Sequence, residues 1–175
     1  WEAMWAVNPF YACCDFRSSV MALNPANGQL IWRSYMIQEE SKLIKKRLFL
    51  PDQYGPSGAP VWSQPALDAK RNRLYVGTGE NYSSPATDTS DSIIAIDLNT
   101  GEMLWKQQFL ASDAWNVACE SPFYFNCPSE RGEDLDFGAP PILVTVDGQD
   151  IILAGQKTGA VFALDADKEG ELLWQ

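Results

Sequence analysis

Four polar side chains with the chemistry of metal ligands or proton acceptors follow turn-like segments of the sequence. Glu80 and Asn81 come directly after Gly-Thr-Gly, and Asp113 and Asn116 belong to the segment Asp-Ala-Trp-Asn. Carboxylate and carboxamide oxygens are ligands that calcium prefers, and a carboxylate can also accept a proton from a reacting group. If the fold brings these segments together, they predict a metal or acid–base site.

A tryptophan and a lysine complete the set of candidates. Trp62 follows the segment GPSGAPV, and Lys157 lies in the segment GQKTG. A lysine ammonium can donate hydrogen bonds to an anionic oxygen, and an indole ring can stack on a planar ligand. Each residue also has an ordinary structural explanation, because most tryptophans of β-proteins are core residues and a Gly-rich turn needs no ligand.

The four cysteines are Cys13, Cys14, Cys119 and Cys127. Their spacing and the absence of histidine do not fit a zinc site or a haem-attachment motif. Cys119 and Cys127 flank a loop of a size that a disulfide could close, although two free buried thiols would also fit. The adjacent Cys13 and Cys14 could be joined through a strained ring or remain two thiols. A disulfide would indicate an oxidising compartment.

Three similar segments predict the elements that must position these residues. They are VMALNPANGQLIW (Val20–Trp32), IIAIDLNTGEMLW (Ile93–Trp105) and VFALDADKEGELLW (Val161–Trp174). In each, an apolar strand leads into an Asn/Asp- and Gly-containing turn and a second strand ends in tryptophan, as in a β-hairpin. The distance from the strand's alanine to the tryptophan is 10, 10 and 11 residues. A repeated hairpin indicates an array of similar units.

The terminal indole of each unit is large enough to wedge between neighbouring sheets, which is typical of a propeller blade. We therefore predict an all-β propeller of four-stranded, Trp-ended blades, with repeat ends at Trp32, Trp105 and Trp174. Propellers close with about four to eight blades. Residues 1–175 are therefore expected to form one partial propeller of about three repeats, excerpted from a larger ring. The spare residues of each repeat should lie in loops, where propellers carry their function.

The remaining segments are expected to be strands, turns and loops, with no helix. Residues 109–138 should be the longest irregular stretch, and the basic run Lys42–Arg47 should be a solvated loop or a short helix. The further strands that we expect are Val61–Ala66, Arg73–Gly77, Ile142–Val146 and Ile151–Ala154.

Charge and hydropathy disfavour two classes of partner. The formal net charge is −10 and the isoelectric point is near 4.4, whereas a nucleic-acid groove needs clustered lysine and arginine. The sequence also contains no stretch near the ~18–20 apolar residues that a membrane span requires. We therefore expect neither nucleic-acid binding nor a membrane span in this chain.

Taken in order, several segments resemble quinoprotein alcohol dehydrogenases. They are GPSGAPVWSQPALDAKRNRLYVGTGENYSSP, IIAIDLNTGEMLWKQQ, DAWN and IILAGQKTGAVFALD. Members of this family are eight-bladed propellers that bind pyrroloquinoline quinone (PQQ) and calcium on the axis. The ACCDFR and DAWNVAC segments are most similar to the polyvinyl alcohol dehydrogenase branch. The resemblance covers nearly the whole chain.

The resemblance implies roles for individual residues. Trp62 matches the tryptophan that forms the floor under the quinone ring, and Lys157 matches the lysine that reaches the quinone oxygens. A calcium-binding glutamate of the family is replaced here by Cys13-Cys14. Elsewhere in the family a pair of adjacent cysteines covers one face of the quinone, and this pair could do the same.

The chain departs from the family at the remaining positions. The family's metal-binding asparagine falls on Glu80, with Asn81 beside it, and its catalytic aspartate falls on Asn116. Because an amide cannot take up a proton at neutral pH, Asp113 or Glu80 would have to act as the base. The resemblance therefore implies a metal set of Glu80, Asn81 and Asn116, and a catalytic pair of Asp113 and Asn116.

The function implied by the resemblance is the PQQ-dependent oxidation of a primary or secondary alcohol, including a polymer such as polyvinyl alcohol. Hydride would pass to PQQ beside calcium, and electrons would pass to a cytochrome c or a quinone in the periplasm. The isolated chain is expected to bind PQQ poorly. One alternative is a non-catalytic PQQ-like propeller that serves as a scaffold in the cell envelope. Another is a propeller that binds sugars or polymers without redox chemistry.

Overall fold

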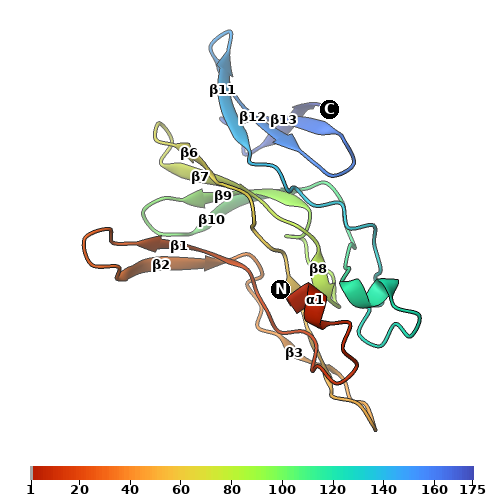
Figure 1. Cartoon of the computed structure of the whole chain (residues 1–175). Coiled ribbons are helices and arrows are strands. Elements are labelled where there is room, and N and C mark those ends of the chain that lie inside the picture. The colour runs from red at the N-terminus through yellow and green to blue at the C-terminus, as the bar shows by residue number, and fades with distance from the viewer. Residues whose placement is uncertain (1) are drawn as a thin grey trace.

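The structure, a computed structural model, describes residues 2–175 and consists of successive antiparallel sheets that fan out side by side (Figure 1). Blade 1 is the hairpin of β1 (Ser19–Leu23) and β2 (Leu30–Tyr35). Blade 2 has the strand order β10-β9-β7-β6, and blade 3 has the order β11-β12-β13-β14. The all-β fold is therefore confirmed, and blades 2 and 3 have the four strands predicted, whereas blade 1 has two.

The strands of blade 2 are β6 (Ala66–Asp68), β7 (Arg73–Gly77), β9 (Ser92–Asp97) and β10 (Met103–Gln108). Those of blade 3 are β11 (Ile142–Val146), β12 (Gln149–Gly155), β13 (Val161–Asp165) and β14 (Glu171–Trp174). Two small sheets lie outside the blades. One pairs β3 (Lys42–Lys45) with β4 (Gln53–Gly55), and the other pairs β5 (Ser57–Gly58) with β8 (Asn81–Ser83).

The alanine of each repeat lies directly opposite its tryptophan. The cross-strand pairs are Ala22 with Trp32, Ala95 with Trp105 and Ala163 with Trp174. In all three hairpins the register shifts at the same point, because the residue before the tryptophan has no partner in the register. Such a bulge increases the local twist. The extra residue of the last turn leaves this arrangement intact.

Each tryptophan of the first two blades covers the turn glycine of the next blade. A Cβ atom on Gly101 would lie 2.6 Å from the Trp32 indole, and one on Gly170 would lie 2.6 Å from that of Trp105. The Trp32 Nε1 also donates a hydrogen bond to the Leu98 carbonyl oxygen at 2.9 Å. The repeated tryptophan therefore joins neighbouring blades, as the sequence predicts.

Two hydrophobic clusters fill the spaces between the blades. Met36, Leu74, Val76 and Ile96 belong to the cluster that joins blades 1 and 2. The cluster between blades 2 and 3 contains the residues Tyr75, Ile93, Trp105, Phe137, Ile152 and Phe162. Phe137 comes from the irregular segment 109–138, and its burial fixes the segment beside it against the blades.

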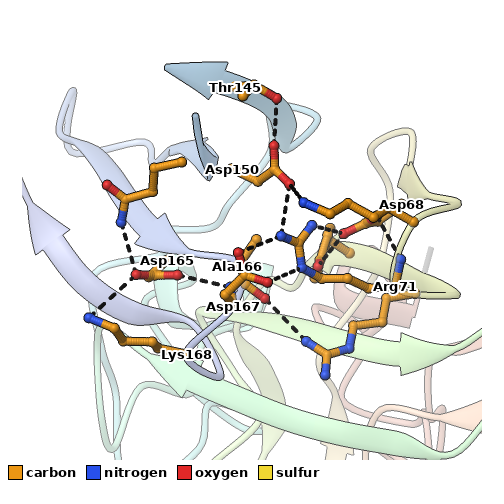
Figure 2. A network of polar contacts seen from close by, with 12 residues as sticks. Asp68, Arg71, Thr145, Asp150, Asp165, Ala166, Asp167 and Lys168 are labelled. Carbon is orange, nitrogen blue, oxygen red and sulfur yellow. Dashed lines mark hydrogen bonds and ion pairs between the residues drawn. The ribbon is translucent and has the colours of Figure 1, made fainter. Parts of the chain in front are cut away.

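A polar network also joins blades 2 and 3 (Figure 2). Arg71, from the turn between β6 and β7, pairs with Asp68 of its own blade at 2.9 Å. It also pairs with Asp150 at 2.8 Å and with Asp167 at 2.6 Å, both in blade 3. The side chain of Arg71 is only 8% exposed. A single guanidinium therefore satisfies three carboxylates from two blades.

Three expectations about local structure were wrong. A strand was expected at Val61–Ala66, but strand β6 begins only at Ala66 and ends at Asp68. Pro60 and Pro65 have no backbone N–H to donate to a neighbouring strand. The basic run at residues 42–47 contains strand β3, which pairs with β4. Two short helices also occur, α1 (Glu2–Trp5) and the 3₁₀ helix η1 (Val117–Glu120). Apart from η1, residues 109–138 are irregular, as expected.

Candidate functional site

A cavity of about 520 Å³ lies where the loops of blades 2 and 3 meet the N-terminal segment. Its charged lining consists of Glu80, Asp134, Asp136 and Lys157. Trp62 is the most exposed aromatic residue of the lining, at 59%. The rest of the lining is largely apolar and includes Met4, Phe16, Val61, Tyr82, Trp115 and Val117. A predominantly apolar cavity with a few convergent polar groups is typical of a small-molecule site.

Three carboxylates converge in this cavity. One oxygen from each of Glu80, Asp134 and Asp136 lies within 4.8 Å of the other two. Glu80 and Asp136 are buried, and the Asp134 side chain is 30% exposed. Oxygen atoms at this spacing can share one hard cation.

The backbone fixes Asp136 from two sides. Its Oδ1 accepts a hydrogen bond from the Glu80 N–H at 2.9 Å, and its carbonyl oxygen accepts one from the Lys157 N–H at 3.0 Å. A Cβ atom on Gly79 would collide with Asp136 Oδ1. The Gly-Thr-Gly turn therefore allows the irregular segment to lie against the end of β7, which brings three distant parts of the sequence together.

Lys157 joins the carboxylates to Trp62. Its ammonium group forms ion pairs with Asp134, at 2.6 Å, and with Asp136. It also lies 5.3 Å from the centroid of the Trp62 ring, a cation–π distance. Burial lowers the pKa of Lys157, but the hydrogen bonds to Asp134 and Asp136 outweigh it and raise the pKa above its usual value. Lys157 is therefore a permanent cation.

One lysine cannot neutralise three carboxylates. Burial, together with the neighbouring Asp136, raises the pKa of Glu80 far above its usual range. Glu80 Oε2 is buried and has no hydrogen-bond partner among residues 2–175. Burial also raises the pKa of Asp134. For Asp136, burial is outweighed by hydrogen bonds with Glu80 and Lys157, so its pKa is lowered. Without a metal ion, these shifts favour a protonated Glu80 beside an ionised Asp136 that pairs with Lys157.

The structure places Trp62, Glu80 and Lys157 in one cavity, but it does not bring the two predicted asparagines there. Asn81 is fully buried, and its Oδ1 accepts a hydrogen bond from the Thr87 N–H. Asn116 is also fully buried, and its side chain is hydrogen-bonded to backbone groups through both Nδ2 and Oδ1. Neither amide lines the cavity.

Asp113 is buried behind the cavity and does not line it. Burial is the main cause that raises its pKa, and repulsion from Asp134 and Asp136 adds to it. The residues that sequence reasoning missed are Asp134 and Asp136. Their only signal is a pair of aspartates two positions apart before the buried Phe137, inside a stretch that has no periodic pattern.

Both cysteine pairs are disulfide-bonded, Cys13 with Cys14 and Cys119 with Cys127. Cys13 and Cys14 are buried in a cluster with Ala6, Tyr82 and Ala118. They do not line the cavity themselves, but Tyr82 does. The adjacent pair therefore supports the aromatic wall of the cavity from behind.

Comparisons with known proteins agree with this architecture. Residues 15–175 match the PQQ family model described as "Glucose/ethanol/alcohol dehydrogenase, beta-propeller domain". A polyvinylalcohol dehydrogenase of Pseudomonas sp. is 36% identical over 171 residues, which are 97% of this chain and 26% of that protein. The polyvinylalcohol dehydrogenase of Sphingopyxis sp. (strain 113P3) is 36% identical over 170 residues, covering 95% of this chain and 26% of that protein.

Among solved structures, the quinohemoprotein alcohol dehydrogenase of Comamonas testosteroni is similar in fold, with a TM-score of 0.59 and 22% identity. The match covers 91% of this chain and 24% of that one. The chain thus spans about a quarter of the length of the relatives that it matches. Within residues 2–175, no helix is long and apolar enough to cross a membrane. On the extent of the family-model match, the chain belongs to the PQQ β-propeller family of glucose, ethanol and alcohol dehydrogenases.

Proposed function

We propose that this chain forms part of a PQQ-dependent alcohol dehydrogenase and supplies one side of its cofactor and metal site. The observation that carries the proposal is the convergence of Glu80, Asp134, Asp136, Lys157 and Trp62 on one cavity. A scaffold propeller would not need a lysine, a half-exposed indole and three carboxylates in the same place.

The residues present fit a cation. Three carboxylates face one ammonium group, and Glu80 Oε2 is buried without a hydrogen-bond partner among the described residues. Burial and the neighbouring Asp136 keep Glu80 protonated in the absence of a cation, and a divalent cation could displace that proton and bind the carboxylate that results. We assign Glu80 and Asp136 as ligands, with calcium as the ion that matches an all-oxygen donor set.

The residues also fit a planar, oxygen-rich cofactor. Trp62 offers an exposed indole face, and Lys157 offers a permanent positive charge next to it. When bound, PQQ would supply the carbonyl that accepts the hydride of the alcohol. In this chain, Trp62 would support the quinone ring and Lys157 would point toward the quinone oxygens. The Cys13–Cys14 pair would pack against Tyr82, which lines the cavity.

We assign proton uptake from the alcohol to Asp134. Asp134 lines the cavity, is partly exposed, and is hydrogen-bonded to Lys157 at 2.6 Å. Burial raises the pKa of Asp134 although the hydrogen bond with Lys157 opposes this, and a raised pKa makes a carboxylate a stronger proton acceptor. Asp113 and Asn116 are less suitable, because neither lines the cavity and Asn116 cannot accept a proton. We also leave Asn81 out of the proposed metal set, because it does not line the cavity.

Substrate, acceptor and compartment follow from the relatives and the disulfides. Two relatives at 36% identity are named polyvinylalcohol dehydrogenases, which favours a secondary alcohol on a hydrocarbon chain. Other relatives are quinohemoproteins, which favours a cytochrome c or a quinone as the acceptor. The two disulfides favour an oxidising compartment, for which we propose the periplasm.

The test is reconstitution of the full-length protein with PQQ and calcium, followed by dye-linked oxidation of a secondary alcohol. Lys157→Ala and Trp62→Ala should each lower kcat/KM by at least about 100-fold, because each removes a group that touches the cofactor. Lys168→Ala, which removes a lysine exposed at the edge of blade 3, is the control and should be neutral.

A well-folded full-length protein that binds no PQQ would contradict the proposal and leave the non-catalytic scaffold. Binding of PQQ without dependence on Lys157 would show that the cofactor lies elsewhere.

A further inference from the structure

The cavity has an apolar wall that none of the proposed cofactor or metal contacts uses. We define the apolar wall as Met4, Trp115 and Val117, all of which line the cavity. Met4 belongs to α1, and the other two residues flank Asn116 at the start of η1. The polar residues, in contrast, come from the β7–β8 connection and from residues 134–157. The segments at α1 and η1 can therefore bind a carbon chain, while the segments with the polar residues act on its hydroxyl group.

Asn116 holds the middle of this wall in place. Its Nδ2 donates to the carbonyl oxygens of Tyr82, at 2.8 Å, and Asn126, at 2.9 Å. Its Oδ1 accepts from the Ala118 N–H at 2.9 Å and caps η1. Both donors and the acceptor are thus satisfied within a fully buried side chain. Because Trp115 and Val117 are its direct neighbours in sequence, their backbones are fixed by the same three bonds.

A second asparagine connects this loop to the N-terminal segment. Asn126 Nδ2 donates to the Ala6 carbonyl oxygen at 2.9 Å and to that of Asn8 at 3.1 Å. The Cys119–Cys127 disulfide closes the loop that follows Asn116 and contains Asn126. Figure 1 shows α1 beside η1, and the two helices are in contact. Met4, Trp115 and Val117 therefore lie on segments that are linked to each other by hydrogen bonds and packing.

We propose that Asn116 is a positioning residue, and that the apolar wall it holds binds the hydrocarbon backbone on either side of the reacting hydroxyl. The inference rests on the proposed function and names its substrate class: alcohols carried on a long carbon chain, such as a polymer of alternating methylene and hydroxymethine groups, whose CH2 and CH groups would pack against the wall. Asn116 is fully buried, its Nδ2 and Oδ1 are hydrogen-bonded to the backbone, and it does not line the cavity, so it presents no atom to a ligand there.

Asn116→Asp separates a positioning role from a catalytic one. In a positioning role, the carboxylate would set oxygen against the Tyr82 and Asn126 carbonyl oxygens, so KM for a polymeric alcohol should rise about tenfold or more. If the side chain at position 116 instead faced the reacting hydroxyl, replacing the amide by a carboxylate would supply a proton acceptor there, and kcat would rise. A rise in kcat would overturn the proposal.

Trp115→Ala and Val117→Ala test the wall itself without touching Asn116, so they remain informative if Asn116→Asp does not fold. The quantity measured is kcat/KM for polyvinyl alcohol divided by kcat/KM for ethanol. This ratio should fall about tenfold in each variant, because packing against the carbon backbone of the polymer is lost. Phe123→Ala, in the adjoining loop closed by the Cys119–Cys127 disulfide but outside the cavity lining, is the matched control. An equal change in Phe123→Ala, or an unchanged ratio in Trp115→Ala, would contradict the wall.

Calorimetric binding of polyvinyl alcohol oligomers to the full-length protein without PQQ separates the two proposals. Binding that weakens in Trp115→Ala but not in Phe123→Ala supports the wall even if no PQQ-dependent oxidation is found. PQQ-dependent oxidation with polymer binding that is insensitive to Trp115 would support the proposed function and overturn the wall.

Discussion

Gly79 lies where the backbone at the end of β7 runs against the carboxylate of Asp136. A side chain there would collide with Asp136 Oδ1, the atom that accepts the Glu80 N–H. The backbone of Gly79 itself is held by the Pro60 carbonyl oxygen at 2.9 Å. Neither the Gly79 backbone nor the Asp136 carboxylate can therefore move away easily. The proposed metal cluster depends on the absence of a methyl group at position 79.

We predict that Gly79→Ala weakens cation binding by about 10-fold to 100-fold, the range seen when groups supporting a metal ligand are lost. The measurement is a titration with Tb³⁺, a luminescent substitute for calcium, sensitised by Trp62. Gly155→Ala is the control, because a Cβ atom there would make an ordinary contact of 3.8 Å with Ala139. Equal affinities in the two variants would show that Asp136 is not a ligand.

At the scale of elements, the hairpin repeat joins a tryptophan of one blade to a turn glycine of the next. Gly28, Gly101 and Gly170 all have positive φ, at 71°, 75° and 74°. Only the last two lie under an indole, whereas a Cβ atom on Gly28 would meet no atom within 4 Å in the described part of the chain. The three turns therefore share a backbone conformation and differ in what covers them.

This difference allows conformational strain to be separated from lost packing. Gly28→Ala should cost about 1–2 kcal/mol of unfolding free energy, from the positive φ alone. Gly101→Ala should cost a further ~1–3 kcal/mol, because the new methyl group overpacks the Trp32 indole. Chemical denaturation of the two variants measures the difference. Equal losses would mean that the tryptophan contact contributes nothing to joining the blades.

The hairpins could be predicted from the sequence because their determinants are local. The spacing from Ala22 to Trp32 and from Ala95 to Trp105 is the same as the pairing in the structure. The carboxylate cluster could not be predicted in the same way. Asp136 reaches it only through backbone contacts with Glu80 and Lys157, 56 and 21 positions away in the sequence. Turn residues predict hairpins, but no local pattern encodes such contacts.

At the scale of the whole molecule, Arg71 links blades 2 and 3 on the side of their turns (Figure 2). Its carboxylate partner Asp68 is buried in blade 2 and also accepts a hydrogen bond from the Tyr75 hydroxyl at 2.9 Å. Burial alone would raise the pKa of Asp68, but the hydrogen bonds from Arg71 and Tyr75 lower it below its usual value. The network therefore stabilises the fold only while Asp68 is ionised.

We predict that Arg71→Met lowers the unfolding free energy by about 3 kcal/mol at neutral pH, because Asp68 would be left as a buried charge without its cation. In the wild type, the stabilisation is present above pH ~4 and is lost as pH falls through the depressed pKa of Asp68. Arg71→Met should therefore flatten the loss of stability below pH 4. Thermal unfolding from pH 2 to pH 7 measures both effects, with the exposed Lys168→Ala as control. An Arg71→Met profile parallel to the wild-type profile would refute the assignment.

The tryptophan and the turn glycine of a blade contact opposite neighbours, and this arrangement affects how such an array of blades can evolve. Blade 2 offers Gly101 to the blade before it and Trp105 to the blade after it. A copied blade inserted between two others would find both of its neighbours already complementary. Gene duplication could therefore lengthen the array one unit at a time, without requiring any new contact to arise first.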